Sequence, residues 1–125
     1  LGIFHKIIIA VGQNSSKKRF FDIELMMFKI NEAFKDVPQV EIKTFKGLTA
    51  SFAKDEGAKF ILRGLRNTTD FEYENSIANI NKYLAEGLET VFLITSPELA
   101  AISSTVIREV YKNGGKVDEF IPYKL

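Results

Sequence analysis

The sequence predicts an α/β fold in which short apolar strands alternate with amphipathic helices along 125 residues. Residues 6–12 (KIIIAVG) and 91–95 (VFLIT) are nearly continuous apolar runs, as in strands buried on both faces of a sheet. Segments between such runs repeat apolar side chains every three or four residues, as helices do. We therefore expect a parallel sheet with right-handed crossovers and helices on both faces, within a single domain over residues 1–125.

The first half of the chain carries two strands and two helices. After the strand over residues 6–12 comes a polar loop, and the helix over residues 21–34 repeats apolar side chains until Pro38 ends the pattern. Residues 40–45 alternate Val, Glu, Ile and Lys, as a strand near a sheet edge does. Residues 48–56 are expected to form a short helix, because Gly57 is placed to end it.

The second half repeats this alternation. Residues 60–62 (FIL) are a short third strand, and the longest helix spans residues 70–86 before Gly87. Its expected inward stripe is Phe71, Ile77, Ile80 and Leu84. The strand over residues 91–95 follows, and then a helix over residues 103–113. The expected inward side chains of that helix are Val106, Ile107, Val110 and Tyr111.

Composition excludes several classes of protein. The net charge is +1, so overall charge favours neither nucleic acid nor a membrane surface as a partner. The absence of Cys excludes disulfides, thiol catalysis and thiolate metal sites, and a single His argues against a zinc site. No apolar run approaches the roughly 20 residues that span a bilayer. We expect a cytoplasmic protein.

Four loops of the predicted sheet carry groups that suit phosphate. Ligands of open parallel sheets bind beyond the carboxyl ends of the strands, which here selects the loops after Gly12, Phe45, Leu62 and Thr95. Guanidinium forks match phosphate oxygens, and free N–H groups at a helix start bind anions. The candidate residues are Ser15, Ser16, Lys17, Lys18, Arg19, Leu48, Thr49, Arg63, Gly64, Leu65, Arg66, Ser103, Ser104 and Thr105. We expect the charged and polar members to gather at one rim and bind phosphorylated substrates, while Leu48 packs on an uncharged part of a substrate.

Each loop also has an interpretation without a ligand. Lys17 and its neighbours could be a solvated basic loop, Leu48 the first core residue of a helix, and Ser103 an ordinary N-cap. Arg63 follows a buried strand directly and needs either a ligand anion or a carboxylate. The carboxylates within reach are those of Asp70, Glu72 and Glu74.

Six short motifs resemble the bacterial phosphopantetheine adenylyltransferase family in order and spacing over essentially the whole chain. The most specific are residues 62–66 (LRGLR) followed by residues 70–74 (DFEYE). The others are residues 16–18 (SKK), Asn81, residues 91–93 (VFL) and residues 102–104 (ISS).

The resemblance implies a Rossmann-like nucleotidyltransferase fold and a reaction of coenzyme A biosynthesis. Members of the family transfer the adenylyl group of ATP to 4′-phosphopantetheine, giving dephospho-coenzyme A and pyrophosphate. The resemblance also implies Mg²⁺ as a cofactor, held mainly by substrate oxygens and water, and a homo-hexamer.

The same resemblance implies a role for each matching residue. Lys17 and Arg63 would be the catalytic residues, holding the attacking phosphate and the α-phosphate of ATP. The pantetheine arm would lie along Leu48, Thr49 and Asn81. The ATP-binding residues would be Gly64, Leu65, Arg66, Glu74, Leu99, Ala100, Ala101, Ile102, Ser103, Ser104 and Thr105. No nucleophilic side chain is needed, because the substrate phosphate is itself the nucleophile.

The chain departs from the family pattern in two places. The family's opening strand, Gly-x-Phe-Asp-Pro loop and Gly-His pair have no counterpart, and His5 lies too close to the following strand to replace that histidine. We expect the native protein to be longer, and a chain without these parts to be impaired and to leave sheet edges unpaired. Leu99, Ala100 and Ala101 replace an aromatic residue and a serine, which is expected to loosen ATP binding.

Three other functions remain as alternatives. A non-catalytic nucleotide-binding or coenzyme A-binding module would account for the absent histidine. An adenylyltransferase acting on nicotinamide mononucleotide or a glycerol phosphate is disfavoured by residues 70–74 and Asn81. A receiver-like signalling domain would need an acidic cluster at the strand ends, where Gly12, Phe45, Leu62 and Thr95 stand instead.

Overall fold

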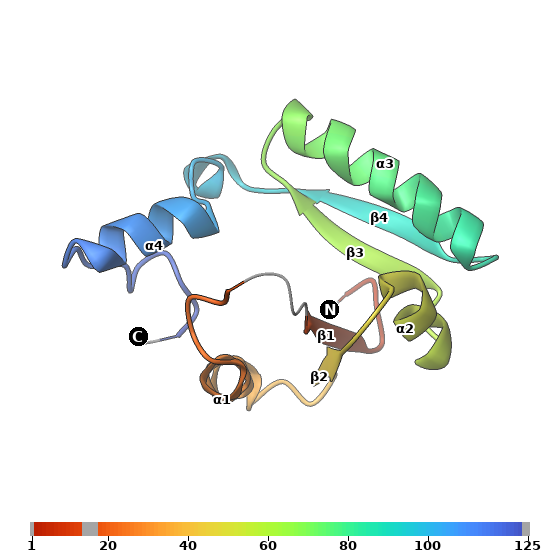
Figure 1. Ribbon diagram of the computed structural model, residues 1–125, viewed down its shortest axis with the longest axis horizontal. Coiled ribbons are helices and arrows are strands. Elements are labelled where there is room, and N and C mark those ends of the chain that lie inside the picture. Colours follow the sequence, from red (N-terminus) through yellow and green to blue (C-terminus); the bar gives the residue numbers. More distant parts are fainter. Residues whose placement is uncertain (1, 14–17, 124–125) are drawn as a thin grey trace. The chain divides into compact units, whose positions relative to one another are not determined.

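The computed structural model describes residues 2–13 and 18–123. Within them, strands and helices alternate in the predicted order (Figure 1). The strands are β1 (Ile7–Gly12), β2 (Val40–Phe45), β3 (Phe60–Leu65) and β4 (Glu89–Ile94). The helices are α1 (Ile23–Phe34), α2 (Thr49–Asp55), α3 (Thr68–Leu84) and α4 (Ser104–Lys112), with a short 3₁₀ helix, η1 (Pro97–Leu99), that the sequence pattern does not predict.

The strands pair in parallel, as predicted, and they form two sheets of two strands each. β1 pairs with β2 in a register that begins at Ile7↔Val40, and β3 pairs with β4 in a register that begins at Phe60↔Glu89. Helix α1 connects the first pair and helix α3 the second. In the described part of the chain, each strand is therefore paired along one edge only. Across the same residues, no helix combines the length and the apolar character needed to cross a bilayer.

The chain divides into two compact units. The first comprises Leu1–Phe45 together with Ser103–Leu125, and it holds β1, β2, α1 and α4. Aromatic rings join α4 to the segment before α1: Tyr111 lies edge-on to Phe20 and Phe21, with ring centroids 6.2 and 5.9 Å apart. Such pairs add stability beyond their buried area. The C-terminal helix is thus anchored within the first unit by ring packing.

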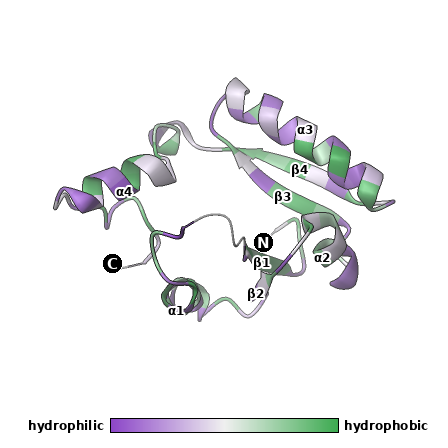
Figure 2. Cartoon of the chain, in the orientation of Figure 1, coloured by the Kyte–Doolittle hydropathy of each residue, from purple (hydrophilic) through white to green (hydrophobic). Residues whose placement is uncertain are grey.

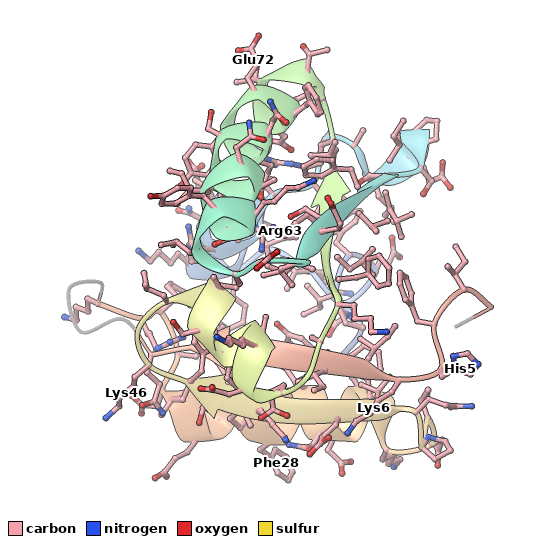
Figure 3. The ribbon with its side chains drawn as sticks, turned by 90° about the vertical axis from the view of Figure 1, so that its right-hand side faces the viewer. His5, Lys6, Phe28, Lys46, Arg63 and Glu72 are labelled. Atoms are coloured by element: carbon pink, nitrogen blue, oxygen red, sulfur yellow. The ribbon has the colours of Figure 1, made fainter. Side chains whose placement is uncertain are left out.

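The prediction that α4 buries its apolar stripe is wrong in part. Figure 2 shows hydrophobic and hydrophilic bands alternating along α4, but Val106 and Val110 remain exposed and the helix has no buried residue. Tyr111, a third member of the predicted stripe, packs against Phe20 and Phe21 but is also 40% exposed. On α1, Phe28 likewise points away from the ribbon (Figure 3) and is exposed.

The second unit, Lys46–Ile102, is built around small side chains. Its core consists of Ala50, Ala53, Ala85 and Leu88, with Ala58 and Ile61 packed against it. Helix α3 lies along β3 and β4 (Figure 1), where Phe71 meets Phe92 edge-on with ring centroids 5.7 Å apart. Gly57 follows the C-cap of α2 with a positive φ of 65°, which confirms it as a helix-ending glycine. α3 ends earlier than predicted, at Leu84, with Ala85 extended, and Gly87 (φ 80°) lies in the turn after it.

β3 is longer than the sequence pattern predicts. The expected strand stops at residue 62, whereas the observed strand runs to Leu65 because Arg63 and Gly64 continue the parallel ladder opposite Phe92 and Leu93. The prediction that both arginines lie in the loop after the strand is therefore wrong for Arg63. Arg63 belongs to the strand, and only Arg66 lies beyond it, just before α3.

Candidate active site

Arg63 lies on the face of β3 that α3 covers. Side chains alternate along a strand, so Ile61, Arg63 and Leu65 share one face. Ile61 adjoins the core of the second unit and Leu65 is buried, while the Arg63 side chain keeps 50% of its surface exposed. The strand thus places a guanidinium group at the border between an apolar face and solvent.

The stripe of α3 that faces this strand is partly polar. Glu74, Ile77, Ala78 and Asn81 follow the i, i+3, i+4, i+7 spacing of one helix face, and all four line one pocket. The predicted stripe is therefore wrong for Ile80 and Leu84, which are 59% and 48% exposed, and Phe71, although it packs on Phe92, is also 45% exposed. Glu74, rather than Ile80, therefore lies toward β3, where it pairs with Arg63.

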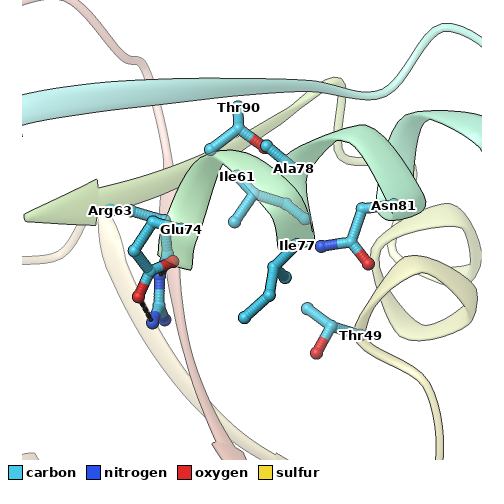
Figure 4. A pocket seen from close by; sticks show the side chains of 8 residues that line it. All are labelled: Thr49, Ile61, Arg63, Glu74, Ile77, Ala78, Asn81 and Thr90. Carbon is cyan, nitrogen blue, oxygen red and sulfur yellow. Dashed lines mark hydrogen bonds and ion pairs between the residues drawn. The ribbon is translucent and has the colours of Figure 1, made fainter. Parts of the chain in front are cut away.

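Glu74 and Arg63 form a forked ion pair (Figure 4). The Arg63 Nε donates to one carboxylate oxygen at 2.8 Å, and a terminal guanidinium nitrogen donates to the other oxygen at 2.5 Å. The Glu74 side chain is only 12% exposed. The hydrogen bond to Glu74 raises the pKa of Arg63 above its ordinary value, against the opposing effect of burial. Of the three carboxylates that the sequence offers to Arg63, Glu74 is the one that pairs with it.

Arg66, directly before the N-cap of α3, repeats this arrangement. Its Nε and a terminal nitrogen donate to the two oxygens of Asp70 at 2.9 and 3.0 Å, and its backbone N–H donates to Asp70 at 3.1 Å. The guanidinium bonds, followed by the backbone bond, lower the pKa of Asp70. Asn67 caps the helix, since its side chain accepts the Asp70 backbone N–H at 2.8 Å. Both arginines thus receive a carboxylate from α3.

The pocket beside Arg63 combines one charged end with a neutral wall. Its volume is about 50 Å³, and Thr49, Asn81 and Thr90 supply neutral polar groups. Ile61, Ile77 and Ala78 supply the apolar part (Figure 4). The lining thus places the Arg63–Glu74 ion pair at one end and neutral polar and apolar side chains along the wall. Three of the predicted substrate residues, Thr49, Arg63 and Asn81, are brought together here.

Other predicted residues of the second unit lie at element ends. Leu48 precedes α2 and is exposed, so it is not the core residue that the alternative interpretation suggests. Gly64 has open space where a Cβ would stand, whereas the Leu65 side chain is buried. Leu99 ends η1, and the rest of the predicted ATP segment in this unit consists of Ala100, Ala101 and Ile102.

Three of the residues predicted to bind phosphate, Ser103, Ser104 and Thr105, lie at the start of α4. Ser103 is its N-cap, with the side-chain oxygen accepting the Val106 backbone N–H at 3.2 Å. Ser104 and Thr105 are exposed in the first turn, and Arg108 donates to the Thr105 hydroxyl at 3.1 Å. Lys17 lies outside the described residues. The gathering of these groups with Arg63 and Arg66 at one rim stays a prediction.

Comparison with known proteins places this site in a family. The cytidylyltransferase-like family matches residues 1–110. A protein of Cytophaga hutchinsonii named phosphopantetheine adenylyltransferase is 58% identical over 125 residues, which is 100% of this chain and 83% of that protein. The chain belongs to the phosphopantetheine adenylyltransferase family.

Further members agree with this assignment. The phosphopantetheine adenylyltransferase of Flavobacterium johnsoniae is 45% identical over 120 residues, covering 96% of this chain and 78% of that protein. That of Lachnoclostridium phytofermentans is 43% identical over 120 residues, covering 96% of this chain and 74% of that protein. Membership in the phosphopantetheine adenylyltransferase family confirms the predicted type of α/β fold and the predicted class of enzyme.

Sequence reasoning missed part of the site of this phosphopantetheine adenylyltransferase family member. Thr90 lines the pocket because it stands opposite Ile61 in the β3–β4 register, and that register is not visible in the sequence. Glu74, which the resemblance implies as an ATP-binding residue, pairs with Arg63 in this structure, and its contact with ATP stays a prediction. A useful signal was available: Glu74 lies three and four residues before Ile77 and Ala78, and so shares their helix face.

Proposed function

We propose that this protein transfers the adenylyl group of ATP to 4′-phosphopantetheine, giving dephospho-coenzyme A and pyrophosphate. The observation that carries the proposal is the pocket in which Arg63 stands at one end and Thr49 and Asn81 form the wall. The 58% identity to a protein named phosphopantetheine adenylyltransferase supports the same reaction. Family membership does not favour a non-catalytic binding module.

The pocket suggests how the acceptor binds. Arg63 holds the phosphate of 4′-phosphopantetheine through guanidinium N–H groups beyond those used by Glu74. Thr49 and Asn81 hydrogen-bond the amides of the pantetheine arm, and the exposed side chain of Leu48 packs on its methylene groups. The volume of about 50 Å³ admits one end of the substrate, and the rest lies along the surface.

The resemblance assigns ATP-binding residues within each unit, and each set is considered by itself. Arg66 contacts the outer phosphates, and the backbone at Gly64 and Leu65 lies beside the nucleotide. At the start of α4, Ser104 and Thr105 supply hydroxyls and free N–H groups for the β- and γ-phosphates. Further members of the proposed ATP site are Glu74, Leu99, Ala100, Ala101, Ile102 and Ser103. Lys17 completes the proposal as a second cation for the attacking phosphate.

The chemistry requires positioning and charge stabilisation more than a reactive side chain. A phosphate oxygen of 4′-phosphopantetheine attacks the α-phosphorus of ATP, and a new P–O bond forms. The bond from that phosphorus to the oxygen bridging the β-phosphate breaks, and pyrophosphate leaves with the electron pair. Arg63 and Lys17 offset the charge that accumulates on the transferring group.

Mg²⁺ is proposed as a cofactor that the two substrates largely hold themselves. Asp70 and Glu74, the carboxylates beside the arginines, are both engaged by guanidinium groups. Among the described residues, no cluster of three or more metal-ligating side chains occurs. This donor set fits a cation coordinated mainly by phosphate oxygens and water, whose chemical contribution is to neutralise phosphate charge. Removal of Mg²⁺ by a chelator is expected to abolish turnover while the fold persists, measured by circular dichroism.

A homo-oligomer, by family a hexamer, working in the cytoplasm is proposed as the native state. Helix α3 leaves large side chains exposed on the side away from the pocket, namely Tyr73, Ile80 and Tyr83. Exposed apolar side chains grouped on one helix are typical of a surface that another protein covers. Sedimentation velocity tests this part of the proposal, and a monomer at micromolar concentration would contradict it.

The central test is pyrophosphate release from ATP with 4′-phosphopantetheine as acceptor. Arg63→Ala is expected to lower kcat/KM by about 10²–10³-fold, as for the loss of one preorganised donor. Lys82→Ala is the matched control, because Lys82 pairs with Glu89 on the surface of the same unit. We expect near wild-type rates from this control. Binding of ATP or coenzyme A without any pyrophosphate release would instead support the non-catalytic module.

A further inference from the structure

The end of α4 carries an Asn-Gly pair that the proposed function does not use. Asn113 is the C-cap residue and is exposed, and Gly114 follows it with a positive φ of 77°. In the sequence, this is the one asparagine that a glycine follows. Glycine has no Cβ to shield its backbone nitrogen, so that nitrogen can approach the preceding side chain closely.

We propose that Asn113 is a site of spontaneous deamidation, at which the side-chain amide becomes a carboxylate without any enzyme. The Gly114 backbone nitrogen attacks the side-chain carbonyl carbon of Asn113, and the new C–N bond closes a succinimide ring. The bond from that carbon to Nδ2 breaks, and ammonia leaves with the proton of the Gly114 N–H. Water then opens the ring at either carbonyl, which leaves aspartate or isoaspartate at this position. The inference is independent of the proposed function.

Two hydrogen bonds hold the reacting groups apart while α4 is intact. The Asn113 Nδ2 donates to the Glu109 carbonyl at 2.8 Å, so the amide is turned back along the helix. The Gly114 N–H donates to the Tyr111 carbonyl at 3.0 Å. Because the attacking nitrogen and its target are both engaged, the ring can close only when the last turn of α4 opens.

The last turn of α4 is built to open readily. Helix ends fray, because their final carbonyls have no partner within the helix. α4 has no buried residue, and its last turn meets its unit through the Tyr111 ring on Phe20 and Phe21 and through Lys112 over the Phe20 ring. Few buried contacts give a low free energy of local opening. The exposure of the pair also admits the water that the second step consumes.

The product of deamidation does not suit the present end of α4. A carboxylate loses the donor to the Glu109 carbonyl, and it adds a negative charge where the helix dipole is already negative. Isoaspartate also lengthens the backbone of a crowded turn, since a Cβ at Gly115 would stand 2.5 Å from Val110 Cγ1. Val117, which is 3% exposed, follows this turn. Deamidation should therefore loosen the packing of the C-terminal segment.

The experiment incubates the intact protein in mildly alkaline buffer below its unfolding midpoint and maps its peptides by mass spectrometry over time. Labelling with isoaspartyl methyltransferase identifies isoaspartate. Asn31 is the internal control: it is exposed and its Nδ2 donates to the Met27 carbonyl at 2.8 Å, but Glu32 follows it within α1. We expect Asn113 to convert at least about tenfold faster than Asn31. Equal conversion of the two asparagines would overturn the proposal. So would an unmodified Asn113 after an incubation that converts it fully in urea.

Two variants separate the ring chemistry from the opening of α4. Asn113→Gln keeps an amide, but its longer side chain would have to close a larger and much slower ring, so conversion should be lost. Tyr111→Ala keeps the Asn-Gly pair and removes the ring packing of the last turn, so conversion should speed up by about 2- to 10-fold. Phe28→Ala is the matched control, because Phe28 is an exposed aromatic residue of the same unit, and its rate should equal that of the wild type. An unchanged rate in Tyr111→Ala, or an equal gain in the control, would refute local opening of α4 as the controlling step.

A third variant tests the effect of the product on the fold. Asn113→Asp reproduces the new charge without lengthening the backbone. Its unfolding midpoint should lie about 1–4 °C below that of the wild type, and the isoaspartate form, separated by ion exchange from incubated protein, should lie lower still. Equal midpoints of the three forms would contradict the expected loosening of the C-terminal segment.

Discussion

The pair between Glu74 and Arg63 allows stability and function to be separated by two substitutions. Arg63→Met keeps most of the length of the side chain and leaves the Glu74 carboxylate, 12% exposed, without its partner. Breaking a buried pair costs about 3–5 kcal/mol and losing an exposed pair about 0–1 kcal/mol. Because Arg63 is 50% exposed, solvent screens this pair, and we expect a loss of about 1–2 kcal/mol in the free energy of unfolding.

Adding Glu74→Leu to Arg63→Met should reverse most of this loss. The double variant removes the unpaired charge and fills the space with apolar atoms, a replacement that is often neutral or stabilising. Its free energy of unfolding should return to within about 1 kcal/mol of the wild type. Its pyrophosphate release should stay at the level of Arg63→Met, since the phosphate-binding group is still missing.

Urea denaturation followed by circular dichroism measures the stability of each variant, and the pyrophosphate assay measures its function. The comparison requires that the free energy of unfolding fall with urea concentration at the same slope in every variant, because a changed slope indicates a changed denatured state. If Arg63→Met were as stable as the wild type, the ion pair between Arg63 and Glu74 would make no contribution to the free energy of unfolding. If the double variant were no more stable than Arg63→Met, the unpaired carboxylate would not be the cause of the loss.

Two other predictions follow from the second unit. Leu88 is 3% exposed in the alanine-rich core, so Leu88→Ala should lower the free energy of unfolding by about 2–4 kcal/mol in denaturation experiments, whereas Leu84→Ala at a 48% exposed position should cost clearly less. Asp70 has a pKa below its ordinary value of 3.8, because the Arg66 side chain and then its backbone N–H bind the charged form. Its contribution to stability is therefore complete above pH 3.8 and is lost as the pH falls through the lowered pKa of the folded state. Asp70→Asn should weaken the pH dependence of the unfolding midpoint below pH 3.8, and an acid limb identical to that of the wild type would contradict this assignment.

The alternation of strands and helices could be predicted from the sequence because its causes are local. Apolar runs, three- and four-residue repeats and the glycines at 57 and 87 act over a few neighbouring residues, and the observed β2 spans the predicted residues 40–45. The motifs around Arg63 were sufficient to indicate the family. They also selected Thr49 and Asn81, which the structure brings into one pocket with Arg63.

The partner of Arg63 was decided only by the tertiary structure. Asp70, Glu72 and Glu74 are equally plausible in sequence, and the choice depends on how α3 is rotated over β3. That rotation is set by contacts between distant segments, such as Phe71 on Phe92, and by the continuation of β3 to Leu65 opposite β4. Local periodicity places residues on a common helix face, but only packing against another element determines which face is turned inward.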